Sequence, residues 1–182
     1  MSWVLANLPT IAGHLLAHLL QAVPAIVASF VLAIPIARLA RVARPLRAVL
    51  VTGSSLLYAV PSLALFVILP IILATGIRDP LNVIVALTLY GLALLVPATA
   101  DALDAVDARV LDAATAMGMG RLRCFLTVEL PLAGPAILTG LRVVTVSTIS
   151  LTTVGAVLGV RSLGWLFTDG FQRGIAAEIL TG

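Results

Sequence analysis

Residues 112–131 read DAATAMGMGRLRCFLTVELP and lie between two long apolar runs. This stretch is polar and broken by glycines, in a chain that is 61% hydrophobic and only 10% charged. A composition so far from that of an average soluble domain indicates a membrane protein. Such a protein has little reason to keep this stretch in water unless the stretch meets something outside the bilayer. We therefore expect the chain to contact a partner here.

Long uncharged runs flank this stretch. Each is long enough, alone or with its flanks, to cross a hydrocarbon core of about 30 Å as a helix of roughly 20 residues. The run over 48–77 is too long for one straight span, since it would reach roughly 45 Å, so we expect it to tilt, bend or break at Gly53, Pro61 or Pro70. The pattern predicts an all-α, polytopic membrane protein with four complete transmembrane helices, built on the uncharged runs 15–37, 48–77, 80–100 and 143–160 with their flanks. The fourth helix is expected to begin near Pro131.

The end of the sequence, residues 171–182 (FQRGIAAEILTG), begins a further apolar pattern and predicts the start of a fifth helix. We interpret residues 1–182 as one transmembrane domain. An N-terminal helix and the first span occupy about 3–40, and the core occupies about 48–182.

The distribution of arginine predicts the orientation, because all eleven basic residues are arginines. Four follow the first span and three lie in the long polar segment, which together are Arg38, Arg41, Arg44, Arg47, Arg109, Arg121 and Arg123. Cytoplasmic loops collect such residues, so both loops are expected inside the cell and the N-terminus outside. Trp3 and Trp165 then fall at the outer interface, where indole rings prefer to lie. No basic residue precedes Arg38, so we expect no cleavable signal peptide.

Other classes of function are disfavoured by the sequence. The net charge of +3 comes without a basic patch interleaved with aromatics, so no nucleic-acid partner is expected. Cys124 is the only cysteine, and a reduced thiol is expected there. His14 and His18 share one helix face but lack a nearby third ligand, so interfacial histidines that face water are favoured over a metal site. An enzyme is disfavoured because no catalytic constellation or P-loop is present.

The polar segment, residues 101–130, is expected to form a helical hairpin in the cytoplasm. On a helical wheel, the apolar and polar residues of 101–117 occupy opposite arcs, which predicts one amphipathic helix. Gly118 suits a left-handed helix end, and a second short helix is expected from about 120 to Glu129. Pro131 disfavours helical backbone at Leu130, which predicts a sharp corner before the fourth span. Asp101, Asp104 and Asp107 are expected to form a solvated face and helix caps.

Two interpretations of this hairpin remain open. Amphipathic helices that lie in the membrane interface without a partner are common. Ala113, Ala114, Ala116 and Gly118 nevertheless make a smooth face onto which another protein can pack closely. A helix that only floats on lipid would more often carry Trp, Phe or Lys there.

The segment resembles the EAA loop of the permeases of binding-protein-dependent ABC importers. The corresponding residues are Asp112-Ala113-Ala114, Gly118 and Glu129-Leu130-Pro131, with aspartate in place of the usual glutamate. The resemblance implies that Asp112, Ala113, Ala114, Gly118, Leu130 and Pro131 couple the chain to a separate cytoplasmic ATPase. ATP and magnesium would then bind to that partner, and no cofactor is expected in this chain.

A finer resemblance covers roughly residues 35–181. The stretch 58–66 (YAVPSLALF), the pairs Leu89-Tyr90 and Val106-Asp107, and residues 128–142 resemble permeases for glycine betaine, carnitine and choline. This resemblance implies a quaternary ammonium solute and an extracytoplasmic binding protein. The chain is too small to enclose a path alone, so a second permease chain, identical or homologous, is expected. An amino acid such as methionine is the alternative solute.

The solute path is expected to involve Tyr58, Pro61, Ser62, Tyr90, Thr152 and Thr153. Helix packing is an alternative role for these small and aromatic residues. Arg142 lies within the fourth span, and is expected to snorkel or to pair with a carboxylate such as Asp101. A subunit of an ion-coupled transporter is a weaker alternative, because no Asp or Glu interrupts the four apolar runs.

Overall fold

The computed structural model describes residues 2–42 and 44–182. Every regular element in these two ranges is helical. In chain order they are α1 (Ser2–Ala6), α2 (Leu8–Val42), α3 (Arg44–Tyr58), α4 (Ser62–Leu73), α5 (Pro80–Asp104), α6 (Ala108–Ala116), α7 (Arg121–Cys124), a π turn (Phe125–Glu129), α8 (Leu130–Thr152), a 3-10 turn (Thr153–Leu158), α9 (Leu163–Arg173) and α10 (Ala176–Ile179).

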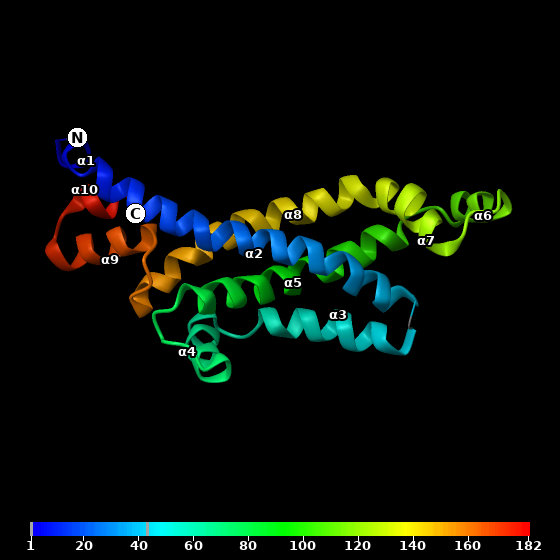
Figure 1. Cartoon of the computed structure of the whole chain (residues 1–182), viewed down its shortest axis with the longest axis horizontal. Helices are drawn as coiled ribbons and strands as arrows, with labels where there is room; N and C mark the ends of the chain where they lie inside the picture. Colours follow the sequence, from blue (N-terminus) through cyan, green and yellow to red (C-terminus); the bar gives the residue numbers. More distant parts are fainter. Residues whose placement is uncertain (1, 43) are drawn as a thin grey trace.

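Three long helices, α2, α5 and α8, run along the molecule (Figure 1). Among the described residues, three segments are long and apolar enough to cross a membrane: Leu8–Arg41, Pro80–Asp104 and Arg121–Leu158. The middle helix, α5, contacts α2, α3 and α8 and is the most buried of the three segments. Three of the four predicted spans therefore coincide with unbroken helical segments that are long enough to cross a membrane.

The second predicted span is broken. Helices α3 and α4 meet at an angle of 110° across the short break between Tyr58 and Ser62. The break contains Pro61, one of the three positions predicted for it, because a proline ring disfavours helical backbone at the residue before it. Gly53 and Pro70 lie inside α3 and α4, so the chain does not break at those two positions.

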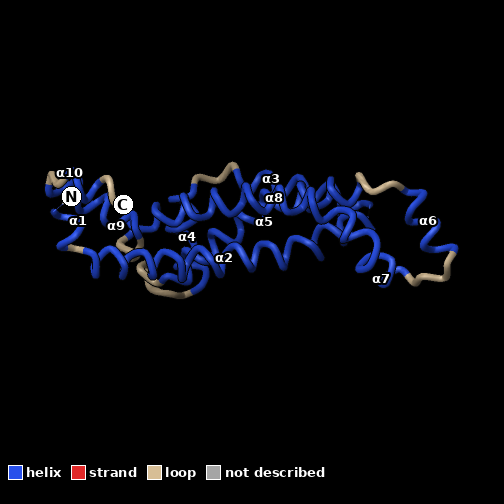
Figure 2. Tube along the Cα trace, turned by 90° about the horizontal axis from the view of Figure 1, so that it is seen from above, coloured by secondary structure: helices blue, strands red, loops and turns tan. Residues whose placement is uncertain are grey.

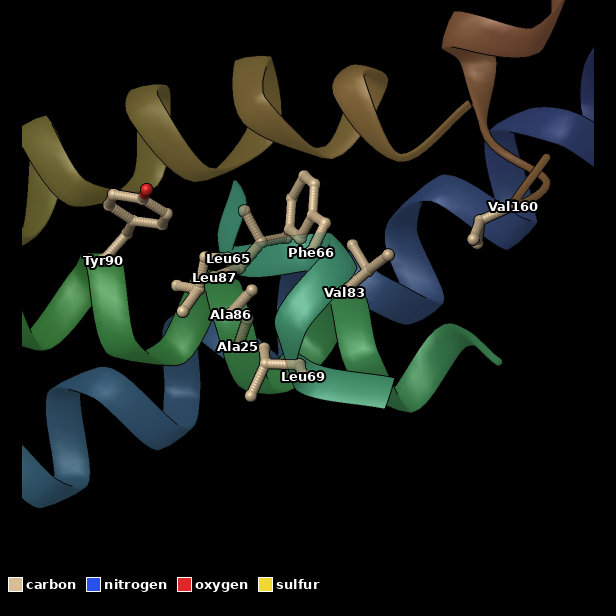
Figure 3. Packing of buried hydrophobic residues seen from close by; sticks show 9 residues of the cluster. All are labelled: Ala25, Leu65, Phe66, Leu69, Val83, Ala86, Leu87, Tyr90 and Val160. Carbon is tan, nitrogen blue, oxygen red and sulfur yellow. The ribbon is translucent and has the colours of Figure 1, made fainter. Parts of the chain in front are cut away.

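The short helix α4 packs its apolar side into the molecule. Leu65, Phe66 and Leu69 of α4 are buried against Leu87 and Tyr90 of α5, as Figure 3 shows. Two further buried clusters continue the core along α2, α5 and α8 toward the hairpin. The core thus extends along the interfaces between the long helices.

Helices α2, α5 and α8 approach one another closely at Gly91 of α5. A Cβ atom placed there would lie 2.1 Å from Oγ of Ser29 on α2 and 3.2 Å from Cγ1 of Val144 on α8. The Ser29 hydroxyl is buried and donates to the carbonyls of Ala25 and Thr88. Small residues that let helix backbones approach are typical of membrane bundles.

The two ends of the bundle carry different elements. Helices α6 and α7 extend from one end, whereas α1, α9, α10 and both chain termini lie at the other (Figures 1 and 2). The expected fifth helix takes a different form: α9 ends at Gly174, whose φ is +69°, and the four-residue α10 packs against α9.

Candidate functional site

The polar segment does form a hairpin, but its first arm is shorter than predicted. The predicted continuous helix over 101–117 is wrong, because α5 ends at Asp104 and a new helix, α6, begins at Ala108. The Asp107 carboxylate accepts a hydrogen bond from the backbone N–H of Arg109 at 2.9 Å. This N-cap satisfies one of the free donors of the new helix and fixes where it begins. Asp107 is therefore a cap, as expected.

Gly118 reverses the chain between the two arms. Its φ is +83°, so the predicted left-handed helix end is confirmed. The second arm begins at Arg121, as predicted, and continues through α7 and the π turn to Glu129.

The predicted corner at Leu130 and Pro131 is wrong. Leu130 has helical backbone angles (φ −63°, ψ −43°), and the π turn passes into α8 without a break. Proline inside a helix normally clashes with the carbonyl four residues earlier. The wider π turn just before Pro131 provides room at that point. The hairpin is therefore continuous with the long helix α8.

The tip of the hairpin exposes apolar side chains. Met117 is 72% exposed, Leu122 is 64% exposed and Val110 is 41% exposed. Asp112 and Ala113 are exposed as well. Ala114 differs from the expectation that it belongs to a face open to a partner, because it is buried, and α6 contacts the hairpin's second arm.

A group of ion pairs holds the base of the hairpin to the bundle. Arg41 of α2 lies 3.2 Å from Asp104 at the end of α5, and also contacts the carboxylate of Glu129 in the π turn. Arg47 of α3 lies 2.5 Å from the other oxygen of Asp104. We call Arg41, Arg47, Asp104 and Glu129 the base cluster. Asp104 is thus an ion-pair partner rather than only part of a solvated face.

Sequence reasoning did not predict the base cluster. The arginines recur at every third position from Arg38 to Arg47, which indicated a cytoplasmic loop. This spacing does not reveal which carboxylate each arginine meets. The pairs depend on the crossing of α2, α3 and α5, which is a tertiary property.

Beside the base cluster, the guanidinium of Arg38 lies over the aromatic ring of Phe125. Its guanidinium carbon is 3.8 Å from the ring centroid of Phe125, which is 5% exposed. Such cation–π contacts add further attachment between α2 and the π turn. Arg38 and Arg121 also line a pocket of about 320 Å³ together with Cys124, which is a buried free cysteine.

The structure brings four of the six predicted path residues together around the α3–α4 break. The rings of Tyr58 and Tyr90 are 6.0 Å apart at an interplanar angle of 84°. The Tyr90 hydroxyl donates to the carbonyl of Val60, which lies in the break beside Pro61 and Ser62. Tyr58 is 47% exposed, whereas Tyr90 is 4% exposed. Tyr90 therefore satisfies a backbone acceptor that the bend frees.

Thr152 is the last residue of α8, and Thr153 begins the 3-10 turn that follows and that contacts α4. Thr152 is buried, and its hydroxyl donates to the carbonyl of Thr148 in the preceding turn. The Thr153 hydroxyl donates to the carbonyl of Ser150. Both hydroxyls are thus used within their own helix.

The expectation that His14 and His18 face water is wrong. They are 5% and 2% exposed, respectively. His14 stacks on Trp165 of α9 with ring centroids 4.8 Å apart. Gln21, on the same side of α2, donates to the carbonyl of Arg161 at 2.7 Å. The histidine face of α2 is therefore covered by α9 and the segment before it.

Several proteins of known function resemble this chain in sequence. It is 36% identical over 136 residues to the ergothioneine transport permease/ergothioneine binding protein of Helicobacter pylori, with 75% of this chain and 24% of that protein covered. It is 28% identical over 153 residues to the glycine betaine/carnitine/choline transport system permease protein of Bacillus subtilis, with 84% and 66% covered. The osmoprotectant import permease protein of Salmonella typhimurium is 31% identical, with 71% and 61% covered. The chain thus spans a quarter to two thirds of these relatives.

Two solved structures share the fold. An inward-facing methionine ABC transporter superposes with a TM-score of 0.80 at 20% identity, with 94% of this chain and 85% of that chain covered. An amino acid ABC transporter superposes with a TM-score of 0.75 at 18% identity, with 91% and 79% covered. Residues 25–181 match the family described as the binding-protein-dependent transport system inner membrane component. The chain belongs to that family of ABC importer permeases.

Proposed function

We propose that this chain is the membrane-spanning subunit of an ATP-driven importer, moved by a separate cytoplasmic ATPase that docks on the α6–α7 hairpin. The observation that supports this most directly is the exposed apolar tip of the hairpin, formed by Val110, Met117 and Leu122. The tip projects from the end of the bundle, away from the other helices (Figure 2). The base cluster joins the hairpin to three helices, so a force on the tip reaches the bundle.

In the proposed topology the chain crosses the cell membrane four times, with the bent α3–α4 pair taken as one crossing. The N-terminus and α9 lie outside and the hairpin lies in the cytoplasm. The excess of arginine at the hairpin end supports this orientation.

The proposed assembly contains two permease chains, identical or homologous, a cytoplasmic ATPase and an extracytoplasmic binding protein. The family to which the chain belongs depends on such binding proteins, as its description states. Three long helices and one bent pair are too few to surround a solute, which supports a second permease chain. ATP and magnesium would bind to the ATPase, and this chain would need no cofactor.

The proposed solute is a quaternary ammonium osmoprotectant such as glycine betaine, choline or carnitine. Relatives that transport such compounds support this choice. The path would pass the α3–α4 break, where Tyr58 presents a half-exposed ring suited to a cationic headgroup. An amino acid such as methionine is the second candidate, favoured by the fold shared with a methionine transporter.

Docking can be tested with two equally exposed apolar residues at opposite ends of the molecule. Met117 at the hairpin tip and Phe171 on α9 are each 72% exposed. Met117→Glu should abolish co-purification of the ATPase, whereas Phe171→Glu should leave it intact. Equal retention of the ATPase by both variants would overturn the docking proposal.

Transport can be tested with the complete complex in lipid vesicles. Uptake of glycine betaine, choline and methionine should require ATP and should stop when the ATPase is inactivated by mutation. Uptake that persists without a working ATPase would favour the ion-coupled alternative instead.

A further inference from the structure

Arg142 occupies an unusual place on α8. Its side chain is exposed on the surface of the chain. At 1.5 Å per residue it lies about 18 Å after Leu130 and about 15 Å before Thr152. Because α8 belongs to the membrane-crossing segment Arg121–Leu158, the guanidinium lies near the middle of the bilayer.

A lipid environment for this side chain is energetically unfavourable. An arginine at the centre of a membrane helix costs about 2.5–3.5 kcal/mol even on the mildest scale. Long basic side chains avoid this cost by reaching the interface, but only near the ends of a helix. Arg142 is more than two turns from either end of α8. Its side of the helix must therefore face water or protein rather than lipid.

The neighbours of Arg142 on α8 support this conclusion. Helical spacing places Pro135, Thr139 and Val146 on the same side, and all three are exposed. The exposed side of α2 differs, because over the same kind of span it carries apolar side chains only: Leu16, Leu20, Val23, Pro24, Val27 and Val31. The α2 side suits lipid, whereas the α8 side carries a cation and a hydroxyl.

No carboxylate of this chain stands at the depth of Arg142. The eight acidic residues are Asp79, Asp101, Asp104, Asp107, Asp112, Glu129, Asp169 and Glu178, and all lie at or beyond the ends of the long helices. A second copy of the chain would bring the same set. Within the described ranges, Arg142 takes part in no ion pair, so the predicted pairing with Asp101 is not formed. The counter-charge must come from another molecule.

We propose that Arg142 lines the solute path and binds the carboxylate of a zwitterionic solute during its passage. This inference rests on the proposed function of the chain. A guanidinium offers two parallel N–H donors to a carboxylate, which gives both attraction and orientation. A solute with an ammonium group but no carboxylate gains nothing from this contact. Arg142 therefore sets selectivity between these two kinds of solute.

Selectivity is tested by uptake of glycine betaine, which carries a carboxylate, and of choline, which does not. In the complete complex, Arg142→Gln should lower glycine betaine uptake at least tenfold relative to choline uptake, and Arg142→Lys should restore part of the loss. Arg173→Gln, on α9 away from the hairpin and from α8's exposed side, should leave the ratio unchanged. An equal fall for both solutes in Arg142→Gln would overturn the proposal and leave the proposed function standing. A wild-type complex that imports neither solute would overturn this proposal and the proposed osmoprotectant solute, whereas ATP-dependent uptake of methionine would still support an ATP-driven importer.

Contact with water is tested without any transport measurement. In a Cys124→Ser background, Thr139→Cys and Arg142→Cys should react with a charged, water-soluble maleimide in membranes. Val27→Cys, on the apolar side of α2, should stay unreactive. Glycine betaine should slow the reaction at Thr139→Cys, a variant that keeps the arginine. If Thr139→Cys is as unreactive as Val27→Cys, this side of α8 does not contact water and the proposal fails.

Discussion

Arg41 and Asp104 lie 3.2 Å apart and join α2 to the end of α5 at the base of the hairpin. Both side chains are partly exposed, at 28% and 34%. We expect Arg41→Gln to cost about 1 kcal/mol of stability, since partly exposed ion pairs contribute little each. The larger effect is expected on the coupling of ATP hydrolysis to transport, because Arg41 also binds Glu129 in the hairpin. Solute uptake per ATP hydrolysed should fall about fivefold.

The measurement is the ratio of solute uptake to ATP hydrolysis in vesicles. Arg173→Gln is the matched control, because Arg173 also pairs with an aspartate, Asp169 at 3.0 Å, but lies on α9 at the other end of the molecule. A normal ratio in Arg41→Gln would show that the base cluster does not transmit movement.

The left-handed backbone at Gly118 gives a second prediction. A Cβ atom there would meet no neighbour within 4 Å, so the effect of Gly118→Ala is backbone strain alone, about 1 kcal/mol. Gly118→Asn should be milder, because asparagine tolerates this conformation. Hydrogen exchange of α6 should rise in Gly118→Ala. Gly120→Ala should not change it, since Gly120 is equally open but has ordinary φ. Equal exchange in all three variants would contradict this account.

The contact between Gly91 and Ser29 predicts that a substitution at Ser29 restores the stability lost by a substitution at Gly91. Gly91→Ala should destabilise the bundle by about 3 kcal/mol, because the added methyl group overlaps Oγ and Cβ of Ser29. Ser29→Gly removes both atoms, so Gly91→Ala/Ser29→Gly should recover most of the lost thermal stability in detergent. Ser29→Ala keeps the Cβ, which lies 2.7 Å from the added methyl, and should recover little. Identical rescue by both second changes would refute the steric explanation.

The Tyr90 hydroxyl provides a test of the broken span. Tyr90→Phe leaves the Val60 carbonyl without this donor and should cost about 1–2 kcal/mol. Tyr58→Phe keeps its ring against Tyr90 and should cost less than about 0.5 kcal/mol. Thermal unfolding of the purified protein distinguishes the two. If Tyr58→Phe is the more damaging change, Tyr58 has a role that its ring contact does not explain.

A pH dependence is expected at α10. Burial raises the pKa of the Glu178 carboxyl above its ordinary value of 4.5, and the nearby Asp169 raises it further, while Arg173 acts in the opposite direction. A carboxyl with a raised pKa in the folded state favours folding while it is protonated. Packing of α10 on α9 should therefore weaken as the pH rises from about 4.5 through this raised pKa.

Proteolysis of the α9–α10 segment at pH 5 and pH 7.5 measures this effect. Glu178→Gln should remove the difference between the two pH values and should protect the segment at pH 7.5. A wild-type segment that is more protected at the higher pH would reverse the sign and contradict the prediction.

The sequence predicted those features that depend on one segment of the chain. The three continuous spans follow from apolar length alone, and the turn at Gly118 follows from a residue that tolerates positive φ. Pro61 likewise marks the broken span by a local steric rule. In each case the physical cause lies within a few residues of the feature.

Features that depend on neighbouring helices were predicted poorly. The helical wheel over 101–117 could not reveal that Asp107 caps a new helix. The rule against helix before proline failed at Leu130, because a π turn accommodates Pro131. His14 and His18 were expected in water because their cover, α9, comes from residues some 150 positions later. The pairing of Arg41 with Asp104 and Glu129 is likewise invisible without the crossing of the helices.

The unbroken course of α2 through Pro24 and Pro35 has a mechanical consequence. A helix of 35 residues is about 52 Å long, so a tilt of about 5° about one end displaces the other by about 4–5 Å. A swing of that size is comparable with the width of a methyl-ammonium headgroup. A movement of α2 at Arg38 and Arg41 can thus displace His14 and His18 at its other end, with no element unfolding in between.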